Sequence, residues 1–170
     1  GACFASGKHR TFCIDGDGGF MMNIQDLATV AINHLPIIFF ILNNNGYGSI
    51  KSSQDSYFAG RRLGTDPSNG LGMPNFKILS KSFGIRYLSA SDNNELKNVF
   101  TEISKSRDPM IVEVFISEMQ KTSPRVTSYL DKDGNLRTSP MEDMSPLLDI
   151  EQLKVIFVNN LSSEILTRER

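Results

Sequence analysis

The sequence predicts an α/β fold in which helices cover both faces of a doubly wound, mainly parallel sheet, giving three layers. Short apolar segments alternate with segments of helical periodicity as far as Ile116. Residues 37–42 are apolar without polar alternation, which suits a parallel strand covered on both faces. Polar clusters containing glycine follow two of the apolar segments, where ligands bind in an open parallel sheet. These three observations together favour the layered fold.

The N-terminal part predicts a strand–helix–strand unit. Residues 2–7 resemble the last turns of a helix closed by a glycine. Since no initiator methionine precedes them, we expect a fragment of a longer protein, with an artefact of preparation as the alternative. Residues 11–15 and 37–42 predict buried parallel strands joined by a right-handed crossover. Asn23 is the expected cap of the helix between them, which Pro36 ends and whose apolar stripe comprises Ile24, Leu27, Ala28, Ala31 and Leu35.

The alternation continues further along the chain. Residues 49–73 show little apolar periodicity and predict a long loop, which in a compact domain is usually functional or mobile. The elements expected after it are a helix over 74–83, a strand over 85–88, a capped helix over 92–103 and a strand over 110–116.

The C-terminal part changes character. Residues 117–146 contain three Ser-Pro pairs and few apolar residues, so we expect an extended arm with a hairpin turn at Asp133-Gly134. A short helix over 150–158 should follow. We therefore divide the chain into an N-terminally truncated α/β core, residues 1–116, and an arm with a terminal helix, residues 117–170, of the same domain.

Composition excludes some classes of function. The formal net charge of -1 gives no electrostatic reason to expect nucleic acid or a membrane surface as a partner. No apolar run approaches the ~18–20 residues that span a bilayer, and no secretory signal opens the chain. Cys3 and Cys13 lack metal-ligand spacing, so we expect reduced thiols in a cytoplasmic protein.

Oxygen donors follow both strands of the first unit. Asp17 lies in Gly16-Asp17-Gly18-Gly19, and Asn44 lies in Asn43-Asn44-Asn45-Gly46-Tyr47-Gly48. Because parallel strands end at one edge of the sheet, these side chains should share a crevice, with their oxygens within about 6 Å. A carboxylate, an amide oxygen and one backbone carbonyl suit Mg²⁺, with positions left open for a diphosphate. The sequence therefore predicts a magnesium diphosphate site.

These residues resemble the thiamine diphosphate motif, Gly-Asp-Gly followed by an asparagine 27 positions after the aspartate (44 − 17). Residues 18–29 look like the acetolactate synthase branch of the family. The resemblance implies the family's diphosphate-binding fold and implies Asp17, Asn44 and the Gly46 carbonyl as magnesium ligands. The full set that it implies for binding thiamine diphosphate is Asp17, Gly18, Gly19, Asn44, Gly46, Tyr47 and Gly48.

The resemblance also implies what lies outside this chain. In the family, the glutamate that activates the cofactor belongs to a pyrimidine-binding domain, usually of another subunit. A bulky apolar residue that bends the cofactor precedes the part matched here. We therefore expect no catalytic residue in this fragment, no activity of the fragment alone, and a homo-oligomeric parent protein.

The substrates implied by the resemblance are a 2-keto acid, which is decarboxylated, and a carbonyl acceptor of the acyl or aldehyde unit. Two alternatives stay open, a 2-keto acid decarboxylase and a non-catalytic cofactor-binding subunit. Acetolactate synthases carry large apolar residues, including a tryptophan, after the asparagine motif, whereas this chain has Ser49–Gln54 and no tryptophan. That departure favours a more polar acceptor. Arg61-Arg62 with Lys51 could contact an anionic substrate, or could form a solvated loop face.

Overall fold

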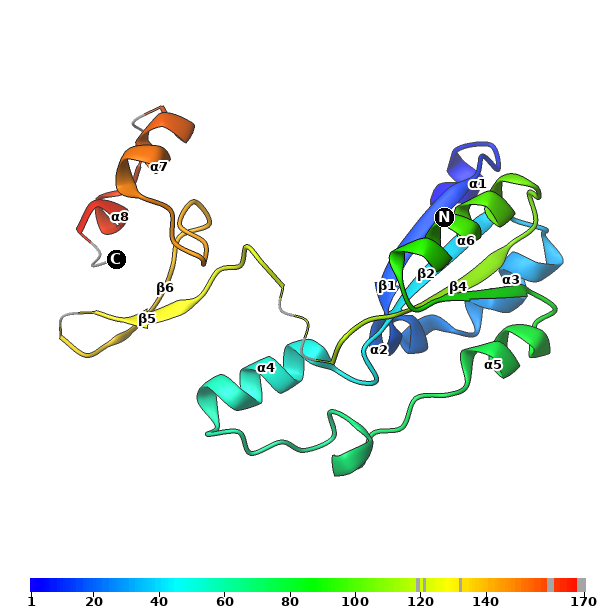
Figure 1. The fold of residues 1–170 in the computed structure, drawn as a ribbon, viewed down its shortest axis with the longest axis horizontal. Helices are drawn as coiled ribbons and strands as arrows, with labels where there is room; N and C mark the ends of the chain where they lie inside the picture. Colours follow the sequence, from blue (N-terminus) through cyan, green and yellow to red (C-terminus); the bar gives the residue numbers. More distant parts are fainter. Residues whose placement is uncertain (119, 121, 132, 159–160, 168–170) are drawn as a thin grey trace. The chain divides into compact units, whose positions relative to one another are not determined.

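The computed structural model describes residues 1–118, 120, 122–131, 133–158 and 161–167. The chain forms two compact units, residues 1–120 and residues 121–170 (Figure 1). The first unit holds the parallel sheet and the predicted site, and the second holds a β-hairpin and two short helices. The division at residue 116 into parts of a single domain stays a prediction.

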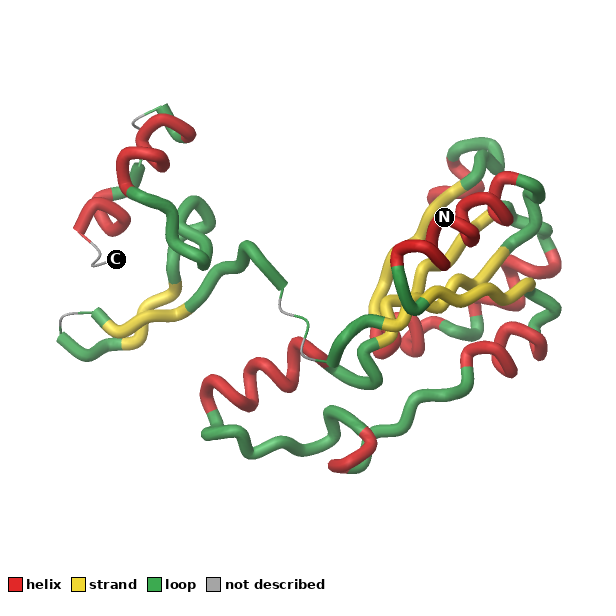
Figure 2. The backbone as a smooth tube through the Cα atoms, in the orientation of Figure 1, coloured by secondary structure: helices red, strands yellow, loops and turns green. Residues whose placement is uncertain are grey.

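The first unit is built on a four-stranded parallel sheet in the order β1-β2-β4-β3. Its strands are β1 (Thr11–Gly16), β2 (Ile37–Asn43), β3 (Arg86–Ala90) and β4 (Met110–Phe115). Figure 2 shows how helices alternate with these strands along the chain. The predicted α/β fold with a mainly parallel sheet is confirmed.

Helices cover the two faces of this sheet unequally. The apolar core of one face includes residues of α1 (Ala2–Ala5), α2 (Asp17–Phe20), α3 (Asp26–Ile32) and α5 (Phe76–Ser82). The core of the other face includes Val99 and Ile103 of α6 (Asn93–Ser104). The chain moves from β1 through β2 to the edge strand β3 and then turns back to β4. This reversal puts α6 on the opposite face, because right-handed crossovers running in opposite directions cover opposite faces.

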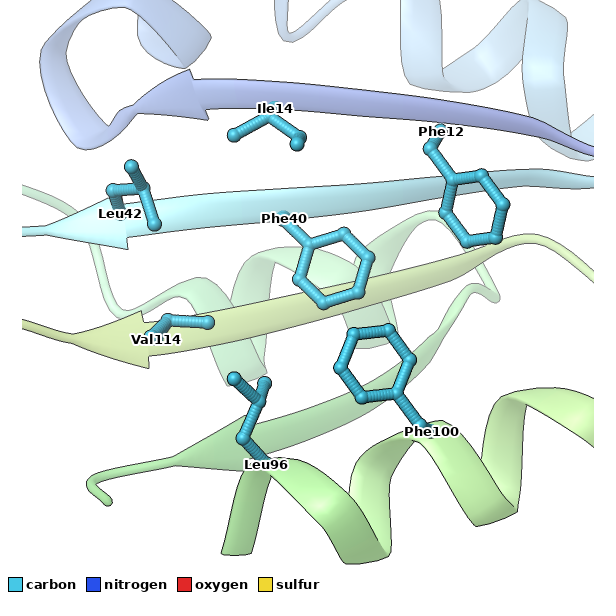
Figure 3. Close-up of a pocket in the computed structure, with 7 residues that line it drawn as sticks. All are labelled: Phe12, Ile14, Phe40, Leu42, Leu96, Phe100 and Val114. Atoms are coloured by element: carbon cyan, nitrogen blue, oxygen red, sulfur yellow. The ribbon is translucent and has the colours of Figure 1, made fainter. Parts of the chain in front are cut away.

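The prediction that residues 11–15 form a buried strand is wrong as to burial. β1 is an edge strand, and Phe12 and Ile14 are 52% and 68% exposed. Helix α6 packs on β3 and β4, so the same face of β1, and of β2 at Leu42, is left open beside it. The result is an apolar groove of about 460 Å³. Figure 3 shows the side chains that line it: Phe12, Ile14, Phe40, Leu42, Leu96, Phe100 and Val114.

The helix after β1 begins earlier than its periodicity indicates. It runs in three pieces, α2, the 3₁₀ turn η1 (Met21–Asn23) and α3, so Asn23 lies inside a turn and is not the cap. Gly16 is extended and α2 starts directly at Asp17. The sequence hides this start because Gly18 and Gly19 have poor helix propensity. Phe20, Leu27 and Val30 are the residues that these pieces bury.

The long loop predicted over residues 49–73 is wrong for its first part. Helix α4 (Gly48–Tyr57) follows the asparagine cluster, and a short 3₁₀ helix, η2 (Pro67–Asn69), comes after it. The only buried residue of α4 is Lys51, so the helix has no apolar stripe that periodicity could detect.

Most of the later elements agree with the sequence. Asn75 caps α5, and Asp92 caps α6 by accepting hydrogen bonds from the N–H groups of Asn94 and Glu95. In the second unit, β5 (Ser128–Leu130) and β6 (Leu136–Thr138) form the predicted hairpin, with Gly134 at φ +79° in its turn. Helix α7 (Ile150–Ile156) is as expected, and α8 (Ser163–Thr167) was not foreseen. Among the described residues, no helix has both the length and the apolar character needed to cross a membrane.

The loop after α4 is held by polar contacts around Asp66. Its carboxylate lies 3.2 Å from the ammonium of Lys51 and accepts hydrogen bonds from the N–H and hydroxyl of Ser68. The backbone carbonyl of the neighbouring Thr65 accepts a hydrogen bond of 2.9 Å from the N–H of Tyr47. The hydrogen bond from the Ser68 hydroxyl, followed by that from Lys51, lowers the pKa of Asp66 to about 2. The loop is thereby fixed to the segment that carries Gly46.

A core substitution should separate the covered sheet face from the open one. We expect Ile111→Ala, at a fully buried position of β4, to reduce the free energy of unfolding by about 2–5 kcal/mol. Ile14→Ala removes the same atoms from an exposed position and should cost less than about 1 kcal/mol. Urea unfolding followed by far-UV circular dichroism measures both. Equal losses would show that the groove is covered in solution.

Acid should remove the contribution of Asp66 to stability. Its folded pKa of about 2 lies below the ~3.9 of an unfolded aspartate, so the contribution is present above about pH 4 and is lost as the pH falls towards 2. We expect wild type to be more stable than Asp66→Asn near neutral pH, and the difference to shrink progressively below about pH 4. Urea unfolding across this pH range measures it. A difference that does not change with pH would contradict the assigned pKa shift.

Candidate cofactor site

The predicted site lies at the carboxyl edge of β1 and β2. Gly16 is the register partner of Leu42, so the residues that follow the two strands start from the same level of the sheet. Asp17 opens α2, and Asn44 begins the loop between β2 and α4. Parallel pairing therefore brings together two residues that are 27 positions apart in the sequence (44 − 17).

Asp17 is the buried charge of this site, with 2% of its surface exposed. Its Oδ1 accepts a hydrogen bond of 2.8 Å from the N–H of Gly18, and its Oδ2 accepts one of 2.9 Å from the N–H of Gly46. Burial raises the pKa of the Asp17 carboxyl, and the hydrogen bonds from backbone N–H groups oppose that rise. The carboxylate therefore links the ends of both strands, and the backbone hydrogen bonds only partly offset the cost of burying its negative charge.

The side-chain amide of Asn44 lies close to both this carboxylate and the backbone carbonyl of Gly46. Its side-chain oxygen lies 3.3 Å from Asp17 Oδ1 and 2.6 Å from the backbone oxygen of Gly46. The distance to Asp17 is well within the expected 6 Å. The structure thus brings together the three oxygen atoms that the sequence suggested as ligands, from Asp17, Asn44 and Gly46.

Three converging acceptors repel one another unless something positive lies between them. One solution is to turn the Asn44 amide by 180°, which lets its nitrogen donate to Asp17 Oδ1 and to the Gly46 carbonyl. The other is a cation. Neighbouring ligands of an octahedral ion at ~2.1 Å are about 3.0 Å apart, and the two oxygen–oxygen distances, 2.6 Å and 3.3 Å, lie on either side of that value.

The donor set suits a hard cation. It combines a carboxylate, a carboxamide and a backbone carbonyl, which are oxygen ligands of the kind Mg²⁺ takes. Within the described part of the chain, no group of three His, Cys, Asp or Glu residues could hold a metal ion. A site rich in nitrogen or sulfur ligands is therefore not the arrangement present among those residues.

Two glycines of the motif are required by close packing. A Cβ atom on Gly18 would lie 2.2 Å from the ring of Tyr47, so the ring packs directly on the backbone of α2. Gly46 has φ +153°, and a Cβ there would lie 2.2 Å from the carbonyl oxygen of Thr65. These glycines let the two loops approach each other.

The remaining predicted residues line the same region. A Cβ on Gly19 would meet the carboxylate of Asp15, and one on Gly48 would lie 2.6 Å from Asn44 Nδ2. The N–H of Gly48 donates to the carbonyl of Gly46. Whether Gly18, Gly19, Tyr47 and Gly48 contact a diphosphate stays a prediction.

The cations proposed for an anionic substrate are mostly engaged in ion pairs. Arg62 forms two hydrogen bonds, of 2.9 and 2.8 Å, with the carboxylate of Asp55. Lys51 is buried between Asp66 and Glu118, at 3.2 Å and 3.5 Å. Arg61 is exposed. A substrate anion would therefore have to compete with protein carboxylates for Lys51 and Arg62.

Sequence reasoning missed the residues that support the asparagine loop. Asn43, Glu113 and Tyr87 form a hydrogen-bonded group beneath it, and Glu118 contacts the side chain of Asn45. Glu113 is the only charged residue in the apolar segment 110–116. A single charge in a predicted buried strand is unusual, and it could have indicated that Glu113 has polar partners in the fold.

Residues 1–114 match the profile of a protein family described as "Thiamine pyrophosphate enzyme, C-terminal TPP binding domain". Three similar curated proteins are acetolactate synthase 1, chloroplastic, of Zea mays (28% identity), the acetolactate synthase large subunit of Parasynechococcus marenigrum (32%) and the probable acetolactate synthase large subunit of Methanococcus aeolicus (31%). The alignments cover 79%, 74% and 77% of this chain and 23%, 20% and 22% of those proteins. The chain thus spans about a fifth of the length of these relatives.

A solved structure shows the same fold. The thiamine diphosphate-dependent 4-hydroxybenzoylformate decarboxylase of Rhodococcus jostii RHA1 matches with a TM-score of 0.60 and 24% identity. The match covers 68% of this chain and 21% of that one. The name of the maize relative places that protein in the chloroplast, so a cytoplasmic location of this chain stays a prediction. Since the family profile matches 114 of 170 residues, this chain belongs to the family of C-terminal TPP-binding domains of thiamine pyrophosphate enzymes.

Proposed function

We propose that this chain anchors the diphosphate of thiamine diphosphate through a Mg²⁺ ion. The Asp17 carboxylate, the Asn44 amide oxygen and the Gly46 carbonyl would be its protein ligands. The observation that carries the proposal is the convergence of these oxygens, 2.6 Å and 3.3 Å apart, around a buried carboxylate. Diphosphate oxygens and water would complete the coordination, as is usual for Mg²⁺.

Each residue has a distinct part in this proposal. Asp17 supplies the negative charge, and its position at the start of α2 is held by the N–H groups of Gly18 and Gly46. Asn44 would turn its amide oxygen towards the ion, the orientation in which that oxygen lies beside Asp17 and the Gly46 carbonyl. Gly46 contributes a carbonyl and, through its N–H, the link to Asp17. Thiamine diphosphate, when bound, supplies the electron sink for decarboxylation, while the protein supplies binding and orientation.

The activity that we propose for the full-length protein is decarboxylation of a 2-keto acid and transfer of the acyl or aldehyde unit to a carbonyl acceptor. The names of the acetolactate synthase relatives support it. It requires a pyrimidine-binding domain of the same or another subunit, within a homo-oligomer. The fragment alone would bind the cofactor without catalysing a reaction. Only the complete protein would therefore be an enzyme, of the transferase or lyase class.

The acceptor distinguishes this activity from a plain decarboxylase. Residues 49–54, where the relatives' branch carries bulky apolar groups, belong to α4 and are mostly serine and other polar residues. A polar helix directly after the asparagine loop favours an acceptor with hydroxyl groups. If the acyl or aldehyde unit took up a proton instead of joining an acceptor, free aldehyde would be released and the protein would be a decarboxylase.

Magnesium with thiamine diphosphate should stabilise the chain. At concentrations near 100 times the dissociation constant, we expect about 2.7 kcal/mol of added stability, seen as a higher thermal midpoint. Asp17→Ala should abolish the increase, because the ion loses its carboxylate ligand. Differential scanning calorimetry with and without Mg²⁺ measures the effect.

Asp26→Ala is the matched control for that experiment. It removes the same charge from an exposed position at the start of α3 and should leave the increase intact. If Asp17→Ala keeps the full Mg²⁺-dependent increase, Asp17 is not a ligand.

Product analysis should reveal the acceptor. We expect the full-length protein to form acetolactate slowly from pyruvate alone, and to form a ligation product faster when a polyhydroxylated aldehyde is added. Liquid chromatography with mass spectrometry identifies the products. Rapid acetolactate formation would contradict the polar acceptor, and release of free aldehyde without any ligation would favour the decarboxylase.

A further inference from the structure

We propose that Glu113 is a positioning residue that sets the conformation of the loop carrying Asn44 and Gly46. Its side-chain hydrogen bonds go to Asn43 and Tyr87 and to none of the three proposed metal ligands, so it would act through Asn43. The importance of this loop for cofactor binding rests on the proposed function, whereas the conformation of the loop can be measured without any metal.

Glu113 lies in an apolar setting. It is 6% exposed and lies in β4, one of the two inner strands of the sheet, with Ile41 and Ser89 as its register partners on either side. Its side chain shares a sheet face with Ile111, two residues earlier, which belongs to the apolar core of that face. A carboxyl group in such a place costs free energy unless donors satisfy its oxygens. Its presence therefore calls for a specific role.

Two donors satisfy the two oxygens of Glu113. The side-chain amide of Asn43 donates to Oε1 at 2.5 Å, and the hydroxyl of Tyr87 donates to Oε2 at 2.5 Å. Burial, followed by this hydrogen bond, raises the pKa of Tyr87 to about 12, so the tyrosine remains a donor. The three side chains connect β3, β4 and β2 on one face of the sheet.

Asn43 passes this constraint to the loop. While its amide nitrogen is held by Glu113, its Oδ1 accepts a hydrogen bond of 2.8 Å from the N–H of Asn45. Asn45 has φ +59°, in the left-handed region that Asn tolerates better than most non-glycine residues, and the hydrogen bond from its N–H to Asn43 Oδ1 holds it in that conformation. Gly46 follows with φ +153°. The turn that aims Asn44 and Gly46 at Asp17 thus depends on the orientation of the Asn43 amide.

The two hydrogen bonds of Glu113 have different consequences. Losing the bond with Asn43 frees the turn at Asn45, whereas losing the bond with Tyr87 leaves that turn unchanged. Groups that orient metal ligands without contacting the metal typically change metal affinity 10–100-fold when removed. This difference gives the test its controls.

The decisive variant is Glu113→Met, which keeps the length of the side chain and removes both acceptors. We expect its Mg²⁺ affinity, measured by titration calorimetry at saturating thiamine diphosphate, to fall at least ~10-fold. Glu113→Gln retains one oxygen for Asn43, with the Tyr87 hydroxyl reversing to accept, and should stay within about 3-fold of wild type. Tyr87→Phe should do the same. Equal affinity in Glu113→Met and wild type, or equal losses in Glu113→Met and Tyr87→Phe, would overturn the proposal.

Hydrogen exchange of the Asn45 amide in the metal-free chain provides the second readout. We expect at least ~10-fold faster exchange in Glu113→Met and an unchanged rate in Tyr87→Phe. If Glu113→Met does not fold, Asn43→Ala replaces it, since the same hydrogen bond to Asn45 is removed from a half-buried position. Absence of Mg²⁺ binding by wild type would refute the proposed function, while the exchange rates would still decide the role of Glu113.

Discussion

The site depends on the burial of the Asp17 carboxylate between two strand ends. Its oxygens accept from Gly18, at the start of α2, and from Gly46, in the loop after β2. Among the described residues, backbone N–H groups rather than a charged side chain are its hydrogen-bond partners. Such donors hold the carboxylate in place without neutralising it, which is why burial still raises its pKa. The close packing at Gly18 and Gly46 follows from this arrangement, because both loops must reach one carboxylate.

The convergence of Asp17 and Asn44 could be predicted because it follows from local rules. Two apolar strands joined by a helix pair in parallel, and the residues after them meet at one edge. The hairpin at Gly134 and the cap at Asp92 are equally local, since each depends on residues within a few positions. The helix start at Asp17 was missed because the two glycines that the site requires also weaken the helical signal.

Features that depend on distant parts of the chain could not be predicted in this way. Helix α4 buries only Lys51, whose partners are Asp66 and Glu118, 15 and 67 positions further on (66 − 51 and 118 − 51). The exposure of β1 reflects which strands α6 covers, a property of strand order that apolar content does not record. Glu113 was visible as a residue, but its connection to the site runs through Asn43, 70 positions away (113 − 43).

The orientation of the Asn44 amide decides whether the site is electrostatically balanced by its own hydrogen bonds or needs a cation. With its nitrogen towards Asp17, the site satisfies itself by hydrogen bonds; with its oxygen there, it presents three acceptors that a cation can balance. The two orientations share one backbone, because only the amide oxygen and nitrogen exchange places. Both orientations need Asn44 to stay beside Asp17, and two hydrogen bonds of Asn43 hold the loop: its Oδ1 accepts from the N–H of Asn45, and its amide nitrogen donates to Glu113. With the loop held in this way, the same residues can form a hydrogen-bonded metal-free site and, in the proposed function, supply three of the ligands of a cation.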